Sequence, residues 1–136
     1  MAKQVVLSRF VSLGTADISN ALSGASLEIT VEEVDKTSLG SAGWREVAAG
    51  LKSGSVTLNF QQDFAAGAID SLLYPLIGTE ATVTIRSSSA TVSASNPAYS
   101  AVVLISQYTP IQGAVGDLAT FDVTFPTIGA ITRATA

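Results

Sequence analysis

The chain contains neither cysteine nor histidine. Their absence excludes disulfide bonds, thiolate nucleophiles, imidazole bases and the most common transition-metal ligands. Carboxylates could still act as an acid–base pair, but the eleven Asp and Glu residues are scattered without a recognisable paired motif. We therefore predict a protein that is not an enzyme and that uses no metal and no cofactor.

Charge is also scarce. Asp, Glu, Lys and Arg make up 13% of the chain, against about 25% in an ordinary domain, and the mean hydropathy is +0.42. A chain of this kind, with 17 Ser and 14 Thr, must cover its surface either with small hydroxyl groups, as a monomer, or with other copies of itself. The net charge of −4 and the seven dispersed Lys and Arg residues argue against tight binding to a nucleic-acid backbone.

Long apolar segments are missing as well. The longest candidate, residues 72–77, is interrupted by Pro75 and is far shorter than the ~18 residues that a membrane-spanning helix requires. Arg9 ends the apolar run at the N-terminus before it reaches the length of a signal peptide. We expect no membrane association, and synthesis in a cytoplasm.

The sequence does contain regular alternation of apolar and polar residues, which is typical of half-buried β strands. Such alternation occurs at residues 27–32, 55–61, 81–86 and 120–125. The parity breaks at Glu33 and Val34, which predicts a bulge or a strand end, and Pro126 is expected to end the last run. A shorter strand is expected at 4–11. The run at 101–105 is apolar at every position, so we expect cover on both faces of that strand, which another subunit could supply in part.

Two segments depart from this pattern. At residues 63–78 the apolar side chains recur every three or four positions, which predicts a helix with Asp63 as N-cap, Gly78 as stop and a regular part that ends near Leu73 because of Pro75. Residues 35–52 have no clean period and predict a long loop. A loop of this length in a compact domain is often functional, and Trp44 favours a contact-making role. The alternative is that Trp44 folds back onto its own core.

At 136 residues the chain fits one domain, residues 1–136. The expected fold is mainly β: a two-sheet β-sandwich with one flanking α-helix and a long inter-strand loop.

Three segments carry a resemblance to a known family. They are GWREVAAGLKSGSVTLNFQQDFAAGAIDSLLYPLIG at 43–78, NPAYSAVVLISQYTPIQGAVGDLATFDVTFP at 96–126, and GAITRAT at 129–135. In their order of strand, long loop, strand, helix and two late strands, they resemble the major tail proteins of siphophages. The resemblance covers nearly the whole chain after Gly14, whereas the N-terminal segment, residues 1–13, matches least.

The resemblance implies a structural virion protein with a tail-tube-like fold. Its copies would form a homo-hexamer ring, and stacked rings would form the tail tube through which double-stranded DNA is ejected without specific binding. The tape measure, terminator and distal tail proteins would be its partners, and assembly would occur in the host cytoplasm. In this family the long loop reaches the neighbouring ring, which makes Trp44, Arg45 and Leu51 candidates for stacking contacts.

Glu28 and Glu32 lie on the polar side of the first alternating run and are candidates for lining the lumen. The alternative for this face is ordinary exposure to solvent on the outside of the particle. Two other functions also stay open. One is a tube-terminating or minor tail protein of the same fold, and the other is a non-catalytic adhesion or carbohydrate-binding β-sandwich.

Overall fold

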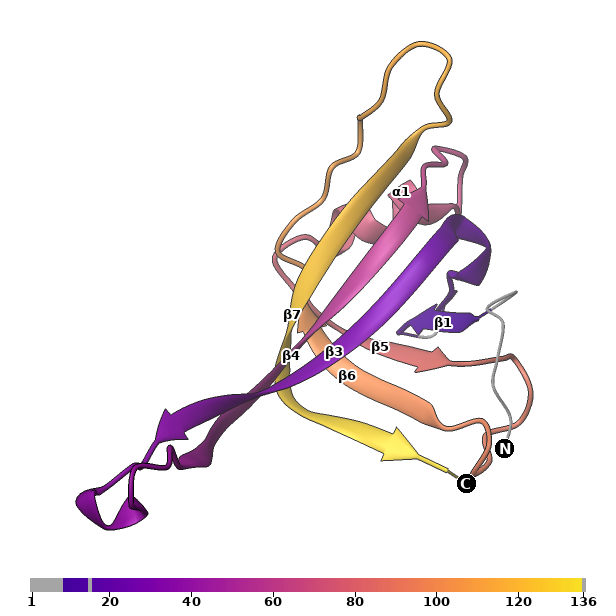
Figure 1. Ribbon diagram of the computed structural model, residues 1–136. Coiled ribbons are helices and arrows are strands. Elements are labelled where there is room, and N and C mark those ends of the chain that lie inside the picture. Colours follow the sequence, from indigo (N-terminus) through magenta and orange to yellow (C-terminus); the bar gives the residue numbers. More distant parts are fainter. Residues whose placement is uncertain (1–8, 15, 136) are drawn as a thin grey trace.

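The computed structural model describes residues 9–14 and 16–135 of the chain (Figure 1). The described residues form seven β strands: β1 (Phe10–Leu13), β2 (Ala16–Asp17), β3 (Leu22–Asp35), β4 (Val47–Gln61), β5 (Glu80–Arg86), β6 (Ala98–Leu104) and β7 (Thr120–Ala134). One short helix, α1 (Ile69–Leu73), and three 3-10 turns, η1 (Ser19–Ala21), η2 (Leu39–Ser41) and η3 (Tyr74–Leu76), complete the elements. The mainly β fold with one flanking helix is confirmed.

All seven strands belong to one antiparallel sheet with the order β2-β1-β5-β6-β7-β4-β3. This sheet folds over itself into two layers because β7 belongs to both of them (Figure 1). Its first half pairs with β4 as far as Pro126, and from Thr127 it pairs with β6. The expectation that Pro126 ends the strand is therefore wrong. Proline has no N–H to donate, and here it marks the residue at which the strand changes its partner.

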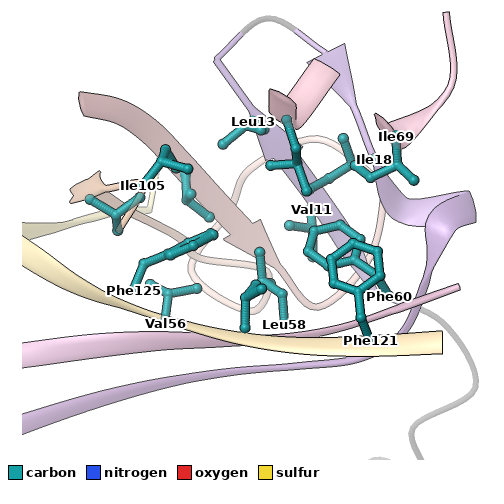
Figure 2. Packing of buried hydrophobic residues seen from close by; sticks show 14 residues of the cluster. Val11, Leu13, Ile18, Val56, Leu58, Phe60, Ile69, Ile105, Phe121 and Phe125 are labelled. Carbon is teal, nitrogen blue, oxygen red and sulfur yellow. The ribbon is translucent and has the colours of Figure 1, made fainter. Parts of the chain in front are cut away.

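The apolar core lies between the two layers, and Figure 2 shows its side chains pointing toward one another. Phe60 of β4 and Phe121 of β7 stack with ring centroids 4.9 Å apart. From the other layer Val11, Val83 and Val103 are buried against them. The core therefore uses one side of each alternating run, as the periodicity predicts.

The predicted strands at 27–32, 55–61, 81–86 and 120–125 are confirmed, and the strand predicted at 101–105 is confirmed as far as Leu104. In β6 the predicted double cover is present in part, because Ala101 and Val103 are buried while Val102 and Leu104 are half-buried. The strand expected at 4–11 is observed only at its C-terminal end, as β1, and its first residues lie outside the described part of the chain.

The predicted helix at 63–78 is wrong in its extent. Only residues 69–73 are α-helical, and the 3-10 turn η3 follows them. Asp63 is not the N-cap: its Oδ1 accepts the N–H of Ala65 (2.9 Å) in a local turn, and Gly67 with φ +80° separates this turn from the helix. The expected end of the regular helix near Leu73 is confirmed.

The predicted long loop at 35–52 is likewise wrong in its extent, because only residues 36–46 lie between β3 and β4, and residues 47–52 belong to β4, which pairs with β3. The bulge expected near Glu33 is confirmed. Val31 pairs with Lys52 and Glu33 pairs with Ala49, so Glu32 faces both Gly50 and Leu51. The two strands continue beyond the core as a long hairpin that projects from the body of the molecule (Figure 1). We call its residues 28–55 the arm and its end, residues 36–46, the tip.

Candidate assembly surfaces

The tip is a well-defined turn that presents Trp44 to solvent. The N–H of Lys36 donates to the carbonyl of Glu46 (3.0 Å), and Thr37 Oγ1 accepts the N–H of Glu46 (2.8 Å). Ser38 and Ser41 cap η2 in both directions, and Ala42 and Gly43 turn the chain with positive φ. Trp44 follows with 79% of its surface exposed. The alternative in which Trp44 folds onto its own core is therefore wrong.

The arm exposes apolar side chains beside its charged ones. Ile29 of β3 is 54% exposed, although it continues the row of core residues that includes Leu27. Leu51, at the bulge of β4, is 78% exposed, and Arg45 is exposed beside Trp44. The structure therefore places all three candidate stacking residues on the arm, with Trp44 and Arg45 at the tip and Leu51 further along β4. Their exposure makes these residues candidates for contacts with other molecules.

The outer side of the β3-β4-β7 layer is a polar face that carries Glu28 and Glu32. Glu28 pairs with Ser55, which pairs in turn with Pro126 of β7. Small polar side chains bond across the strands of this face: Thr57 Oγ1 lies 3.2 Å from Thr124 Oγ1, and Asn59 Nδ2 donates to Asp122 Oδ1 at 2.7 Å. We call this side of the layer the polar face.

The charges on the polar face are of one sign. Along its described residues the charged side chains are Glu28, Glu32 and Asp122. Asp122 was not among the residues predicted from the sequence, because its position beside the other two depends on β7 pairing with β4. In the sequence, its position between the apolar residues Phe121 and Val123 indicates only that it lies on the polar side of its strand. The face is therefore an acidic, hydroxyl-rich surface.

The far end of the molecule carries α1 and a long loop, residues 106–119 (Figure 1). Tyr108 anchors this loop. Its hydroxyl donates to Asp70 Oδ1 of α1, and Gln62 Nε2 donates to the Tyr108 hydroxyl at 3.1 Å. Burial raises the pKa of Tyr108, and its hydrogen bond to the Asp70 carboxylate raises it further. The ring also packs edge-on against Phe121, with centroids 5.2 Å apart.

A groove of about 340 Å³ opens beside α1. Its apolar lining comes from Ile18, Ile69 and Leu72, and Leu118 of the 106–119 loop contributes to its rim. Asp17 and Asp63 are the acidic residues of the lining. Asp17 accepts hydrogen bonds from Ser19, which lower the pKa of its carboxyl group. The sequence did not predict this groove, because its lining comes from four separate segments of the chain.

Within residues 9–14 and 16–135, His, Cys, Asp and Glu residues form no group that could hold a metal ion. The helices of that part of the chain include none that is long and apolar enough to cross a membrane. The candidate surfaces described above are an exposed arm, an acidic polar face and an apolar groove with acidic residues.

No family model and no curated protein matches the chain by sequence. Its fold does match chains of solved particles. One is a chain of the virion of the native gene transfer agent (GTA) particle, which matches with a TM-score of 0.76 and 17% identity over 98% of this chain and 100% of that chain. Another is a chain of the tail of the empty GTA particle, solved with C6 symmetry, with a TM-score of 0.69 and 19% identity over 99% of this chain and 100% of that chain. Over nearly its whole length, this chain therefore has the fold of chains from the GTA virion and its tail.

Proposed function

We propose that the chain is the major tube subunit of a phage-like tail. In this proposal it is a structural virion protein without catalytic activity, six copies close into a ring, and stacked rings form the conduit for double-stranded DNA. The supporting observation is the end-to-end fold match with a chain of a C6-symmetric tail. The tape measure, terminator and distal tail proteins remain the proposed partners.

Ring closure has a physical basis in the sheet edges. β3 is an edge strand of 14 residues, whereas the opposite edge, β2, has two. A long unpaired edge exposes backbone N–H and C=O groups that pair readily with another chain. Closing a ring of copies pairs or covers such edges without leaving one free. We therefore propose that β3 lies at the contact between neighbours in the ring.

Stacking of the rings is assigned to the arm. Trp44 and Leu51 expose most of their apolar surface, and Arg45 adds a planar cation beside Trp44. Trp and Arg are the residue types that most often dominate the binding energy of protein interfaces. These three residues are therefore the proposed contacts between rings.

The polar face is assigned to the lumen. Its acidic residues Glu28, Glu32 and Asp122 would repel the duplex phosphates, which suits a channel that must not retain its cargo. Its remaining side chains are largely Ser, Thr and Asn, which carry no positive charge. The duplex would then pass without specific binding.

Electron microscopy and light scattering of the purified protein test this function. We expect sixfold rings that stack into tubes as the concentration rises, because association covers the exposed apolar surface of the arm. A stable monomer at high concentration would contradict the proposal. Single rings that never stack would instead identify a tube-terminating homologue.

A further inference from the structure

The groove beside α1 and the tip of the arm lie at opposite ends of the same hairpin. Ala21, directly before β3, and Gln61, the last residue of β4, both line the groove. The tip lies at the far ends of these two strands (Figure 1). Because β3 has 14 residues, and a strand rises ~3.3 Å per residue, roughly 45 Å separates them. A tip cannot reach the groove of its own chain.

The two ends carry charges that can pair with each other. The tip carries Lys36 and Arg45 beside one acid of its own, Glu46, and Asp35 directly before the tip accepts the N–H of Thr37. The groove is lined by Asp17 and Asp63, and Asp70 and Asp117 lie on α1 and on the loop beside it.

The described cations outside the arm lie in a different region. Arg9, Arg86 and Arg133 gather around Tyr99: Arg9 and Arg86 line a second cavity with it, and Arg133 pairs with it across the strands. The guanidinium of Arg86 also lies 4.1 Å from the centroid of the Phe10 ring. Of these three, Arg86 acts on a groove residue, because the pKa of Asp17, lowered mainly by hydrogen bonds from Ser19, is lowered further by the charge of Arg86. The described lining of the groove itself contains acids but no Lys or Arg.

Apolar surface is also exposed at both ends. On the tip, Leu39 and Trp44 are exposed, and Leu39 makes up part of η2. Leu118, which lines the groove, is 67% exposed, and Ile111 and Val115 elsewhere on the same loop are exposed too. The groove itself has an apolar lining of Ile18, Ile69 and Leu72. A side chain such as Trp44, with a large apolar area and one polar N–H, suits a site of this composition.

From these observations we infer that the groove beside α1 receives the tip of a second copy of this chain, with Trp44 against the apolar lining and Arg45 near Asp63. The inference rests on the proposed function and extends it by naming the surface that the arm of the adjacent ring contacts. The contact joins two different surfaces of the chain, so it is a head-to-tail contact. When it repeats along the tube axis, it adds ring after ring and does not form a closed assembly. The two ends of a tube would therefore differ, one exposing tips and the other exposing empty grooves.

Cross-linking tests the contact directly, because the chain has no cysteine of its own. Leu39→Cys places a thiol on the tip, and Ala66→Cys places one next to Gly67, which lines the groove. Assembled tubes of the double variant, treated with a short flexible bis-maleimide, should give a denaturation-resistant ladder of dimers, trimers and products larger than hexamers. The matched control pairs Leu39→Cys with Ser89→Cys, an exposed position in the loop between β5 and β6, and should give no ladder.

Several outcomes overturn the inference. Tubes without a ladder show that the tip lies elsewhere, and a ladder of equal strength from the Ser89→Cys control shows that proximity is unspecific. Products that stop at the hexamer place the contact within a ring. If the unmodified protein forms no tubes at all, the proposed function fails, and that result is distinguishable from failure of this contact alone.

A charge exchange provides an independent test. Arg45→Glu and Asp63→Lys, made separately, should each raise the protein concentration needed for tube formation at least tenfold, while circular dichroism stays unchanged. Combined in one chain, the two changes restore an opposite-charge pair at every contact and should recover most of the loss. Losses that simply add in the double variant would overturn the pairing of Arg45 with Asp63.

Discussion

Gly54 is a position where the fold leaves no room for a side chain. A Cβ atom there would lie 2.5 Å from Ile131 Cδ1 and 2.8 Å from the carbonyl oxygen of Glu28. Gly54 sits at the base of the arm, where β7 crosses it and Thr127 Oγ1 donates to the Gly54 carbonyl at 3.1 Å. The missing side chain therefore allows the two layers to approach each other.

We expect Gly54→Ala to lower the free energy of unfolding by about 1–3 kcal/mol, the usual cost of overpacking. Urea unfolding below the concentration of assembly measures this. Adding Ile131→Val removes Cδ1 and should recover part of the loss, whereas the backbone contact with Glu28 remains. Gly40→Ala is the control, because its Cβ would meet only Ser38 Oγ, at 3.7 Å. Where no side chain crowds it, Gly→Ala is expected to leave stability unchanged or to raise it slightly, because it lowers the entropy of the unfolded chain. An equal loss in both single variants would therefore show that crowding at Gly54 is not the cause.

Tyr108 gives a second prediction, in which the effect depends on pH. Tyr108→Phe removes the hydrogen bonds with Asp70 and Gln62 and should cost about 1–2 kcal/mol at neutral pH. Because the pKa of Tyr108 is raised in the folded protein, its contribution is complete below the ordinary tyrosine pKa of about 10 and is lost as pH rises through the higher folded value. The difference between the two proteins should therefore narrow above pH ~10. A difference that stays constant in alkaline urea titrations would show that the hydroxyl stabilises the loop independently of its ionisation.

At the scale of elements, the sequence predicts strands better than it predicts what joins them. The alternation of apolar and polar residues predicts β4 and β7, because this pattern can be recognised within each strand without knowledge of its neighbours. The helix was predicted too long because the apolar spacing at 63–68 fits a helix, whereas Gly67 breaks it with a positive φ. The strand pairing at 47–52 was missed because the bulge at Gly50 and Leu51 disrupts the alternation of β4.

The tip of the arm can be removed without loss of the sheet. Replacing residues 37–45 by Asn-Gly would join Lys36 to Glu46, which already share a backbone hydrogen bond of 3.0 Å, through the two-residue turn that hairpins prefer. We expect the unfolding free energy to change by less than about 1 kcal/mol, because the tip lies outside the core. Rings should form but not stack. Circular dichroism and electron microscopy decide the matter: a lost β signal would assign the tip to the fold, and unchanged tubes would exclude it from stacking.

At the scale of the whole molecule, the candidate surfaces differ in how many secondary-structure elements contribute residues to them. Trp44, Arg45 and Leu51 lie on one hairpin and are all exposed. A surface made by a single local segment of this kind can be predicted from the sequence. The groove combines residues from before β3, the end of β4, α1 and the 106–119 loop. The groove depends on the strand order β7-β4-β3 and on the hydrogen bond between Tyr108 and Asp70. The periodicity of one sequence predicts neither of them.

The proposed channel lining would exist only in the assembled particle, and it gives the last prediction. A ring of six copies, as in the C6-symmetric tail of similar fold, would present twelve carboxylates from two positions per copy, Glu28 and Glu32. Duplex DNA carries one negative charge per ~1.7 Å of axis, so such a lining would repel it. At physiological salt the screening length is ~8 Å, so the repulsion is mild and short in range.

We predict that Glu28→Lys with Glu32→Lys still permits tube assembly, because both side chains are exposed and face away from the core. DNA release should become slower and sensitive to salt, since a basic lining binds phosphates and releases counterions. Particles built with the double variant are followed for DNA release at two ionic strengths. The matched control is Glu33→Lys with Glu80→Lys, which changes the net charge equally and leaves Glu28 and Glu32 in place. Glu33 lies on the opposite side of the arm, and Glu80 is exposed at the start of β5. Normal, salt-insensitive release from intact double-variant tails would place the polar face on the outside of the tube.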